Sequence, residues 1–201
     1  MYPAHIILAS ASPRRRDLLD HLGVRYEVLP ADIHECPHPG EAPEAYVPRV
    51  AAEKSLTAQH LSGNRLPVLA ADTEVVLDGE IFGKPVDEHH ANAMLTRLSG
   101  GEHRVLSAVS LRAGGRHWTA LNTSIVRFGA LAPEDIAAYW ASGEPRDKAG
   151  AYAIQGLGAL FITHLCGSYS GVMGLPLLET AALLANIGIH PLHAVREEAT
   201  P

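Results

Sequence analysis

A short apolar run constrains the fold of this chain more than any other stretch. Residues 67–71 (PVLAA) are continuously apolar and are followed by polar residues, which is the pattern of a buried strand. Asp72 and Thr73 come next, so the strand is predicted to present a carboxylate and a hydroxyl where it leaves the core. A carboxylate in that place suits a divalent cation or a proton acceptor, and it also suits an ordinary turn.

The chain of 201 residues is long enough for one sizeable α/β domain or two closely packed lobes. We predict a single domain over residues 1–189 and a frayed tail over residues 190–201. Strands are predicted over residues 5–10, 26–29, 67–71, 80–82, 102–112, 117–128 and 160–166. The strand over residues 67–71 is predicted to have an extended continuation over residues 74–77. Helices are predicted over residues 13–22, 44–61, 87–98, 133–142 and 177–186, and a turn over residues 167–171. Asp78-Gly79 is the strongest hairpin signal, and a hairpin there folds Lys84 back towards Asp72.

Composition narrows the classes of function. With 47% hydrophobic and 19% charged residues, the chain is typical of a folded globular protein. Its net charge of −6 argues against a broad nucleic-acid surface, although a few basic side chains can still gather in one cleft. No membrane partner is expected, because no apolar run approaches the roughly 20 residues that cross a bilayer. Cys36 and Cys166 are the only cysteines, and residues 1–10 lack the features of a signal peptide, so a cytoplasmic location is expected.

Residues 10–16 (SASPRRR) predict an anion site at the start of a helix. Ser12 is a natural N-cap and a proline follows at the first helical position. The hydroxyls of Ser10 and Ser12 then lie beside free backbone N–H groups at the positive end of the helix. Arg14 and Arg15 are unfavourable there unless an anion compensates them, so we favour a phosphate site over an ordinary capped helix with solvated arginines.

Three further stretches carry candidate site residues. In residues 34–38 (HECPH) the His and Cys side chains could suggest zinc, but the prolines impose an extended loop, and Glu35 is the better candidate as an acidic partner of magnesium. Lys54 is usually solvated at such a helical position, and Lys84 either pairs with Asp72 or shares a metal-bound phosphate with it. Residues 143–158, rich in glycine, predict a loop folded closely against a ligand or another backbone segment, with Gln155 on it.

These stretches together resemble one protein family. Residues 10–15 (SASPRR), 71–73 (ADT), 83–85 (GKP) and 148–156 (KAGAYAIQG) are similar to motifs of the Maf family of nucleoside triphosphate pyrophosphatases. The shorter stretches GSY and GLP, which begin at Gly167 and Gly174, fit as well, and the resemblance covers the chain from about Ile6 to Ile187. Each motif is weak alone, whereas the ordered combination is specific.

The resemblance implies an elongated α/β fold of the Maf and ITPase-like type, in which a mixed, strongly twisted sheet carries helices around a deep cleft. It also implies a cytoplasmic homodimer that uses a divalent cation, Mg²⁺ or Mn²⁺, to hydrolyse a nucleoside triphosphate to the monophosphate and pyrophosphate. Matching the motifs residue by residue gives the proton acceptor and metal ligand Asp72, the substrate-sorting residues Arg14, Thr73 and Gln155, and the lining of the phosphates and metal, Arg15, Glu35, Lys54 and Lys84.

The AYAIQG form resembles the branch of the family that acts on dTTP and UTP. Two departures from the family pattern bear on substrate tuning: Glu74 follows Ala-Asp-Thr where an apolar residue is usual, and residues 170–173 read SGVM instead of a run closer to SNVV. Two alternatives stay open. One is a sister-type enzyme acting on purine nucleotides or 7-methyl-GTP, and the other is a nucleotide-binding regulator of septum formation with little turnover. The complete set of polar residues favours an enzyme.

Overall fold

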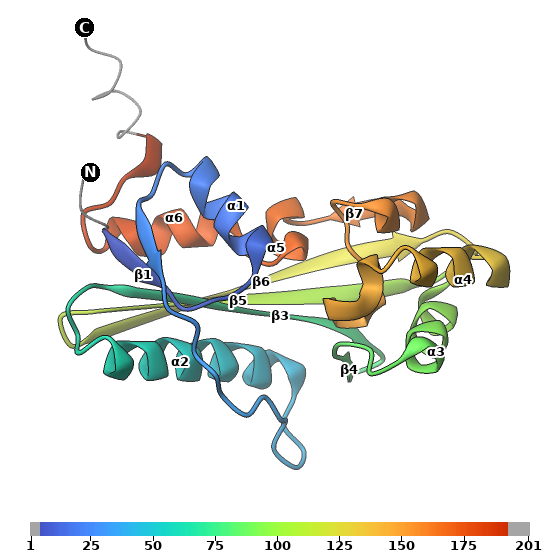
Figure 1. The fold of residues 1–201 in the computed structure, drawn as a ribbon, viewed down its shortest axis with the longest axis horizontal. Helices are drawn as coiled ribbons and strands as arrows, with labels where there is room; N and C mark the ends of the chain where they lie inside the picture. Colours follow the sequence, from blue (N-terminus) through green and yellow to red (C-terminus); the bar gives the residue numbers. More distant parts are fainter. Residues whose placement is uncertain (1–4, 193–201) are drawn as a thin grey trace, which may run out of the picture.

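The computed structural model describes residues 5–192 of the chain. Within that range the fold is built on a twisted seven-stranded mixed sheet in the order β2-β1-β3-β5-β6-β7, with β4 paired to the outer end of β3. The strands are β1 (Ile6–Leu8), β2 (Tyr26–Val28), β3 (Val68–Leu77), β4 (Glu80–Phe82), β5 (Glu102–Ala113), β6 (Arg116–Phe128) and β7 (Ile162–Cys166). The three longest, β3, β5 and β6, run lengthwise through the elongated molecule (Figure 1).

Helices cover both faces of the sheet at one end, which we call the large lobe. The helix α2 (Pro43–Leu61) lies along one face, while α1 (Pro13–His21) and α6 (Leu177–Ala185) cover the other (Figure 1). The strand β1 shows why two covered faces are possible: Ile6 and Leu8 pack towards α1 and α6, while Ile7 packs towards α2. All three side chains are fully buried, as expected for a strand whose apolar run is continuous.

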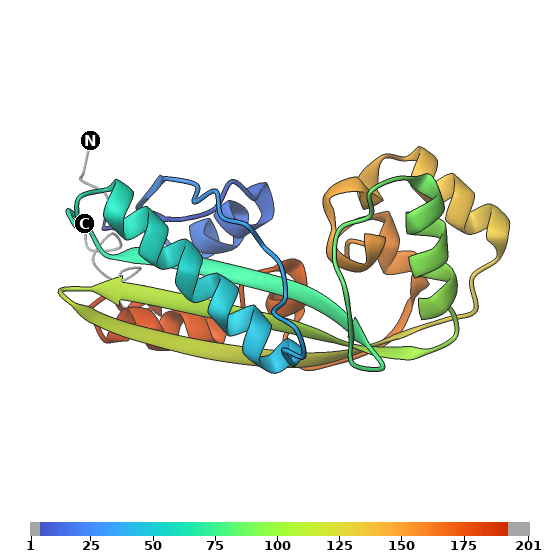
Figure 2. The same cartoon turned by 90° about the horizontal axis from the view of Figure 1, so that it is seen from below.

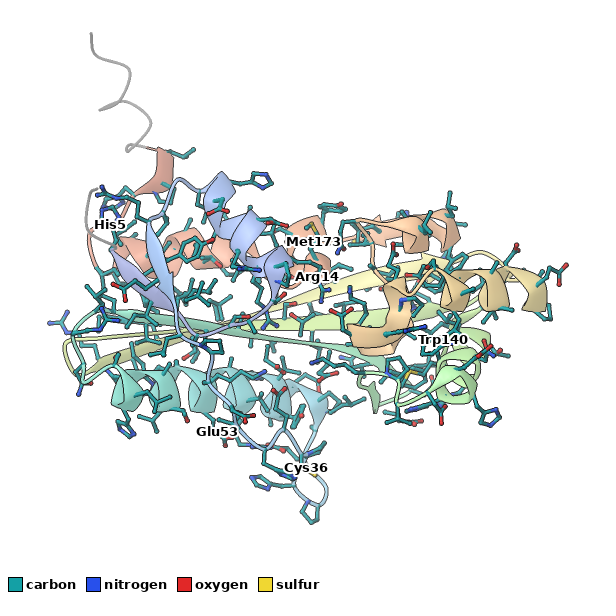
Figure 3. The ribbon with its side chains drawn as sticks, viewed as in Figure 1. His5, Arg14, Cys36, Glu53, Trp140 and Met173 are labelled. Carbon is teal, nitrogen blue, oxygen red and sulfur yellow. The ribbon has the colours of Figure 1, made fainter. Side chains whose placement is uncertain are left out.

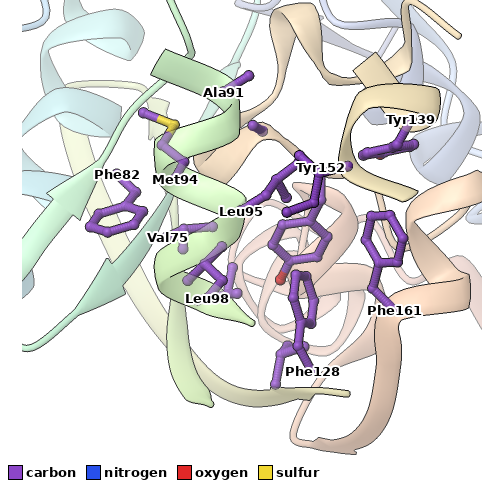
Figure 4. Close-up of a cluster of buried hydrophobic side chains, with 14 residues drawn as sticks. Val75, Phe82, Ala91, Met94, Leu95, Leu98, Phe128, Tyr139, Tyr152 and Phe161 are labelled. Atoms are coloured by element: carbon purple, nitrogen blue, oxygen red, sulfur yellow. The ribbon is translucent and has the colours of Figure 1, made fainter. Parts of the chain in front are cut away.

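The other end of the sheet carries the small lobe. It contains α3 (Glu88–Leu98), α4 (Pro133–Ala141) and the short 3₁₀ helices η1 (Glu144–Asp147), η2 (Ala149–Ala151) and η3 (Leu157–Phe161). Figure 2 shows the small lobe standing apart from α1 and α2, joined to them by the long strands. Its core is aromatic: Tyr152, Phe128, Tyr139 and Phe161 meet edge to face (Figure 4).

The fold class predicted from the sequence is confirmed. Most predicted helices and strands are present with bounds within two residues, and the β3–β4 hairpin turns at Asp78-Gly79 as expected. The helix α2 begins at Pro43 and continues through Pro48, which neither starts nor ends it. Among the described residues no helix combines the length and apolarity that crossing a bilayer requires. The division into one domain with a tail stays a prediction, and residues 193–201 of that tail lie outside the described range.

Two local predictions are wrong. The strand that contains residues 67–71 does not end at Asp72 and Thr73 before its predicted extended continuation, because β5 pairs with β3 without a break from Val68 to Val76. The predicted turn over residues 167–171 overlaps the start of a helix, α5 (Tyr169–Met173), whose N-cap Ser168 accepts a hydrogen bond from the N–H of Gly171. That side-chain cap satisfies one of the free N–H groups of the first turn, which allows so short a helix to form.

Candidate active site

A cavity of about 500 Å³ lies where β3 runs past the end of β1 towards the small lobe. The strand β3 pairs with β1 only at Val68 and Leu69 and with β4 only from Val75 onward, so its edge over residues 70–74 has no strand partner. The parallel strands β1 and β3 thus place the chain that leaves β1 and the middle of β3 beside the same opening. Crevices at the carboxyl ends of parallel strands are the usual ligand sites of such sheets.

The acidic part of the cavity is centred on Lys54. Its Nζ lies 2.8 Å from Asp72 Oδ1 and 2.9 Å from Glu35 Oε2, so one ammonium group joins a carboxylate of β3 to a carboxylate of the 29–42 loop. Asp72 is 3% exposed and Lys54 is 8% exposed, which makes this ion pair one of the least solvated in the chain. The expectation of a solvated Lys54 is therefore wrong: α2 turns this position towards the sheet, where the buried ammonium has two carboxylate partners.

These carboxylates are suited to a divalent cation. Asp72 Oδ2 is buried and has no hydrogen-bond partner, although a buried oxygen of that kind is costly to leave unsatisfied. Across residues 5–192, no three His, Cys, Asp or Glu side chains converge closely enough to hold a metal alone. Magnesium commonly binds through one or two carboxylates together with substrate phosphates and water. Asp72 and Glu35 fit that mode of binding.

The start of α1 supplies a cation without an acidic partner. Arg15 donates from Nε to the carbonyl of Gly174 at 2.8 Å and from a terminal nitrogen to Ser10 Oγ at 3.4 Å. Both acceptors are neutral, and in the described part of the chain no carboxylate lies within ion-pair distance of Arg15. Burial lowers the pKa of the Arg15 guanidinium, and the charge of Asp72 opposes that shift. An enclosed guanidinium with neutral partners is suited to an incoming phosphate.

Two serines lie at the same helix start. Ser10 is buried, and its Oγ accepts from the backbone N–H of Ser12 at 3.2 Å. Ser12 occupies the N-cap position with extended backbone, but its side chain makes no capping hydrogen bond. The predicted capping contact of Ser12 is therefore absent, and the N–H that Ser10 Oγ accepts from is that of the N-cap residue itself. Both serines line the cavity, as predicted for phosphate-binding groups.

Arg14 bridges the cleft between the lobes. Its Nε donates to the carbonyl of Met173 at 3.3 Å, and Figure 3 shows the two residues side by side. On its other side the guanidinium lies 3.6 Å from a carboxylate oxygen of Asp147 in η1. Asp147 also pairs with Lys148, so it is held between two cations. Arg14 is thereby distinguished from Arg15, since only Arg14 has an acidic partner in the small lobe.

Thr73 faces the opposite side of β3 from Asp72, as strand alternation requires. Its Oγ1 shares a hydrogen bond with Ser107 Oγ at 2.8 Å and lies 3.4 Å from the carbonyl of Gly174. Ser107 in turn donates to the carbonyl of Gly171 at 2.6 Å. Thr73 therefore connects β3 to the α5 segment that also contacts the arginines. Ser107 was not predicted from the sequence, because its position only becomes meaningful through the pairing of β3 with β5.

Lys84 and Gln155 reach the cavity from the small-lobe side. Both line it, and in the described residues neither side chain has a hydrogen-bond or ion-pair partner within the protein. The hairpin folds Lys84 back towards the Asp72 region, as the sequence predicted. The structure thus gathers every predicted site residue around one cavity, namely Ser10, Ser12, Arg14, Arg15, Glu35, Lys54, Asp72, Thr73, Lys84 and Gln155. Their individual roles stay predictions.

Glu74 is a cavity residue that the sequence had marked only as a departure from the family pattern. It lies two residues beyond Asp72 on the same face of β3, is 9% exposed, and its Oε2 has no hydrogen-bond partner. Burial raises the pKa of the Glu74 carboxyl to about 8, and the charges of Asp72 and Glu35 add to the shift. Strand alternation alone could have indicated that Glu74 shares the face of Asp72.

Comparison with known proteins agrees with this geometry. A family profile described as "Maf-like protein" matches residues 5–187. A relative from Methylococcus capsulatus named "dTTP/UTP pyrophosphatase" is 62% identical over 184 residues, which cover 92% of this chain and 91% of that protein. A relative from Nitrosomonas europaea with the same name is 53% identical, with coverage of 92% and 95%.

Solved structures give weaker similarities. A HAM1 protein from Coxiella burnetii matches 63% of this chain and 73% of its own with 15% identity and a TM-score of 0.46. A nucleoside triphosphatase described as a dITP/XTP pyrophosphatase, from Mycobacterium abscessus, matches 63% and 75% with 16% identity and a TM-score of 0.42. Similarity in sequence, and not these matches, identifies the family.

Proposed function

The chain belongs to the Maf family, and from that premise we propose that it is a nucleoside triphosphate pyrophosphatase that converts dTTP and UTP to the monophosphate and pyrophosphate. Relatives that are 50–62% identical over most of this chain bear the name of that activity. The polar groups that such a reaction needs line one cavity together.

One structural observation carries the proposal. Asp72 and Arg15 line the same cavity. Asp72 is a buried carboxylate with one oxygen that has no hydrogen-bond partner, and Arg15 is an enclosed guanidinium with no acidic partner in the described structure. Buried opposite charges normally pair with each other. Here Arg15 has neutral partners and Asp72 pairs with Lys54. The cavity is therefore arranged for a ligand that carries its own negative charge and a cation.

The proposed reaction uses Asp72 as the proton acceptor. A water molecule gives a proton to Asp72 as its oxygen forms a bond to the α-phosphorus, and the bond between that phosphorus and the bridging oxygen of the β-phosphate breaks. Pyrophosphate leaves with the electron pair of that bond. Arg15, Lys84 and the serine hydroxyls bind phosphate oxygens and align the bond for this displacement.

Lys54 has a positioning part in this scheme. Its ammonium fixes Asp72 Oδ1 at 2.8 Å, while the buried Oδ2 keeps no hydrogen-bond partner within the protein. A divalent cation, Mg²⁺ or Mn²⁺, would be held by Asp72 and Glu35 and would supply neutralisation of the phosphate charge. The proposal includes the cation because two carboxylates stand beside one lysine here, and a triphosphate would add further negative charge to the same place.

The base is recognised from the small lobe in this proposal. Gln155 presents a carbonyl acceptor and an amide donor side by side, which complement the ring N–H and carbonyl of uracil and thymine. Arg14 and Thr73 contribute by binding the carbonyls of Met173 and Gly174 at the end of α5. Arg14 also contacts Asp147 of the small lobe across the cleft. We further propose a cytoplasmic homodimer that binds neither nucleic acid nor membrane, in keeping with the charge of −6.

A panel of triphosphates tests the function. Pyrophosphate release is measured with UTP, dTTP, CTP, GTP, ATP and 7-methyl-GTP in the presence of Mg²⁺, Mn²⁺ or a chelator. The expected result is preferential turnover of UTP and dTTP that the chelator abolishes. Preference for GTP or 7-methyl-GTP would replace the proposal with the sister-type activity. Tight nucleotide binding without turnover of any member of the panel would favour a regulator.

A further inference from the structure

A single carboxylate lies behind the loop that carries Gln155. We call residues 153–158 the Gln155 loop. At its far end the backbone N–H groups of Leu157 and Gly158 donate to the two carboxylate oxygens of Glu144 at 2.9 and 3.0 Å. Glu144 is the first residue of η1, shortly after the end of α4 at Ala141, and it is half-buried. It is not among the residues that line the cavity, whereas Gln155 is.

The near end of the loop is tied to the same carboxylate through Tyr139. The backbone N–H of Ala153 donates to the Tyr139 hydroxyl oxygen at 3.0 Å, and that hydroxyl donates to Glu144 Oε1 at 2.7 Å. The Tyr139 ring is 4% exposed and lies edge to face on Phe161, with ring centroids 4.9 Å apart (Figure 4). The core of the small lobe thus holds the Tyr139 hydroxyl in place. That hydroxyl and Glu144 together fix both ends of the loop by hydrogen bonds.

The loop is pressed tightly against this clamp. A Cβ on Gly156 would lie 2.1 Å from a Glu144 carboxylate oxygen, and a Cβ on Gly158 would lie 2.7 Å from both the Ala153 carbonyl oxygen and the Tyr139 hydroxyl. Only glycine allows backbone to approach so closely. The glycines after Gln155 are therefore required by the Glu144 clamp, and this requirement explains their positions without any contact to a ligand.

The side chain that the clamp displays has no partner of its own. In the described structure Gln155 makes no hydrogen bond within the protein, and its side chain is exposed to the cavity. A flexible glutamine on a loose loop would lose much of any binding energy to ordering. A loop fixed at both ends presents the same amide already in place.

From this arrangement we propose that Glu144 is a positioning residue for pyrimidine recognition: it holds the Gln155 loop so that the Gln155 amide meets the base. The inference rests on the proposed function, because it concerns how the same site selects UTP and dTTP. Glu144 does not touch the substrate and acts only through the loop.

The charge of Glu144 is maintained by the groups that it binds. Burial acts to raise the pKa of the Glu144 carboxyl, but the N–H of Gly158, the Tyr139 hydroxyl and the N–H of Leu157 together hold it below its ordinary value. The carboxylate therefore offers only acceptors to three donors. A glutamine amide at the same place would offer one acceptor and one donor, so at least one loop N–H would face another donor.

The test variant is Glu144→Gln, with Glu134→Gln as its matched control. Glu134 lies in the first turn of α4 in the same lobe, is exposed, and its side chain makes no hydrogen bond to the loop. We expect Glu144→Gln to lower kcat/KM for UTP and dTTP about tenfold relative to CTP, GTP and ATP, mainly through KM, since one charge-assisted hydrogen bond is lost. Glu134→Gln should leave the preference unchanged.

A double-mutant comparison separates positioning from general damage. In a Gln155→Ala background the amide that recognises the base is already absent. Adding Glu144→Gln should therefore change the ratio of kcat/KM for UTP and dTTP to that for CTP, GTP and ATP by less than about twofold. Faster amide hydrogen exchange at Ala153, Leu157 and Gly158 in Glu144→Gln, with the exchange of the β3–β5 pairing unchanged, gives a readout independent of activity. If Glu144→Gln does not fold, Tyr139→Phe keeps the aromatic ring, removes the relay hydroxyl and should weaken the same preference about threefold.

The outcomes separate this inference from the function on which it rests. A wild-type enzyme without preference among the triphosphates would overturn the proposed function. A wild-type preference that survives both Glu144→Gln and Tyr139→Phe would overturn the positioning role alone. An equal fall in kcat/KM for every triphosphate, or an undiminished effect of Glu144→Gln in the Gln155→Ala background, would also overturn it, because either result describes structural damage unrelated to Gln155.

Discussion

The large lobe and the small lobe meet the cavity with different chemistry. From the large lobe come the charged groups Arg15, Lys54, Glu35 and Asp72. From the small lobe, apart from Lys84 and the ion pair of Asp147 with Lys148, come the neutral amide of Gln155 and the loop that carries it. The cores differ in the same way, since aliphatic side chains fill the large lobe and aromatic rings fill much of the small one.

The difference teaches how one cleft can combine two tasks. Strong charges need a rigid sheet and buried counter-charges to hold them in place, and β3 with α2 supplies both. Recognition of a base needs a few hydrogen-bonding groups in fixed directions, which a loop can give only when something behind it removes its freedom. In the small lobe the aromatic core and Glu144 do that. The following changes test this division of work.

The largest effect is expected for Asp72→Asn on the charged side. This change keeps the size of the side chain but removes the proton acceptor and the charge that holds metal, so turnover should fall at least about a hundredfold. Binding of a non-hydrolysable nucleotide, measured calorimetrically, should fall much less. Asp78→Asn, in the exposed β3–β4 turn, is the matched control with the same loss of charge. Metal is titrated to saturation, and near-normal turnover under those conditions would refute the role of Asp72.

Gln155→Glu tests the neutral side. Glutamate keeps the length but offers only acceptors once ionised, so it should repel a pyrimidine carbonyl and leave a buried group unpaired. A cost of about 1–3 kcal/mol lowers kcat/KM for UTP and dTTP roughly ten- to hundredfold. The measurement is the ratio of these values to those for CTP, GTP and ATP, with Gln59→Glu on α2 as control. A uniform fall for all five substrates would mean that Gln155 supports the loop and does not recognise the base.

A smaller effect should separate the two arginines. Arg15→Lys keeps the charge but loses the planar fork that can hold a phosphate with two hydrogen bonds, so kcat/KM for UTP should fall about tenfold. Arg14→Lys should cost less, because Arg14 already shares its charge with Asp147 across the cleft. Both variants are compared in one assay at fixed ionic strength. Equal losses would contradict the distinction that the structure draws between them.

The smallest effect concerns stability in the small lobe. Burial lowers the pKa of His103 to about 4, and its Nε2 shares a hydrogen bond with the Tyr152 hydroxyl at 2.9 Å. Below the ordinary pKa of about 6.5 the unfolded chain binds a proton that the folded chain does not, so stability falls as the pH falls from 6.5 towards 4. Between pH 7.5 and pH 6 this group should remove about 1 kcal/mol of stability.

His103→Gln should remove that part of the pH dependence, while His164→Gln, an exposed change on β7, should not. A change of 1 kcal/mol shifts the midpoint of thermal unfolding by about 2–4 °C for a chain of this size. When the pH is lowered from about 7.5 to about 6, the midpoint should therefore fall a few degrees less in His103→Gln than in the wild type. Identical slopes in the two proteins would show that His103 is not held neutral in the folded state.

Local sequence signals predicted a large part of the fold. Pro13 at the first helical position marks the start of α1, and Asp78-Gly79 marks the turn between β3 and β4. Such signals succeed because capping, turn geometry and hydrophobic period depend on neighbours within a few residues. They failed at α5, where a hydrogen bond from Gly171 to Ser168 outweighs a turn-rich composition.

The candidate site divides in the same way. The residue types and the order of the motifs were sufficient to select Asp72, Arg15 and Gln155 and to associate them with phosphates and a base. Only the tertiary structure decided that Lys54 is buried between Asp72 and Glu35 rather than solvated, since its partners lie 18 residues away along the chain and in a separate loop. The structure likewise shows Glu74 as a buried residue of the cavity, whereas the sequence had marked it only as a departure from the family pattern.

The sequence by itself therefore determined the elements, the family and the chemical groups available. The pairing of β3 with β5 decided which side of the strand each of those groups faces, and the Tyr139–Glu144 clamp decided where the Gln155 amide lies. The physical reason is that secondary structure and composition follow from contacts between near neighbours. Charge pairing, desolvation and loop closure depend on residues that are far apart in the chain and meet only when the two lobes have packed.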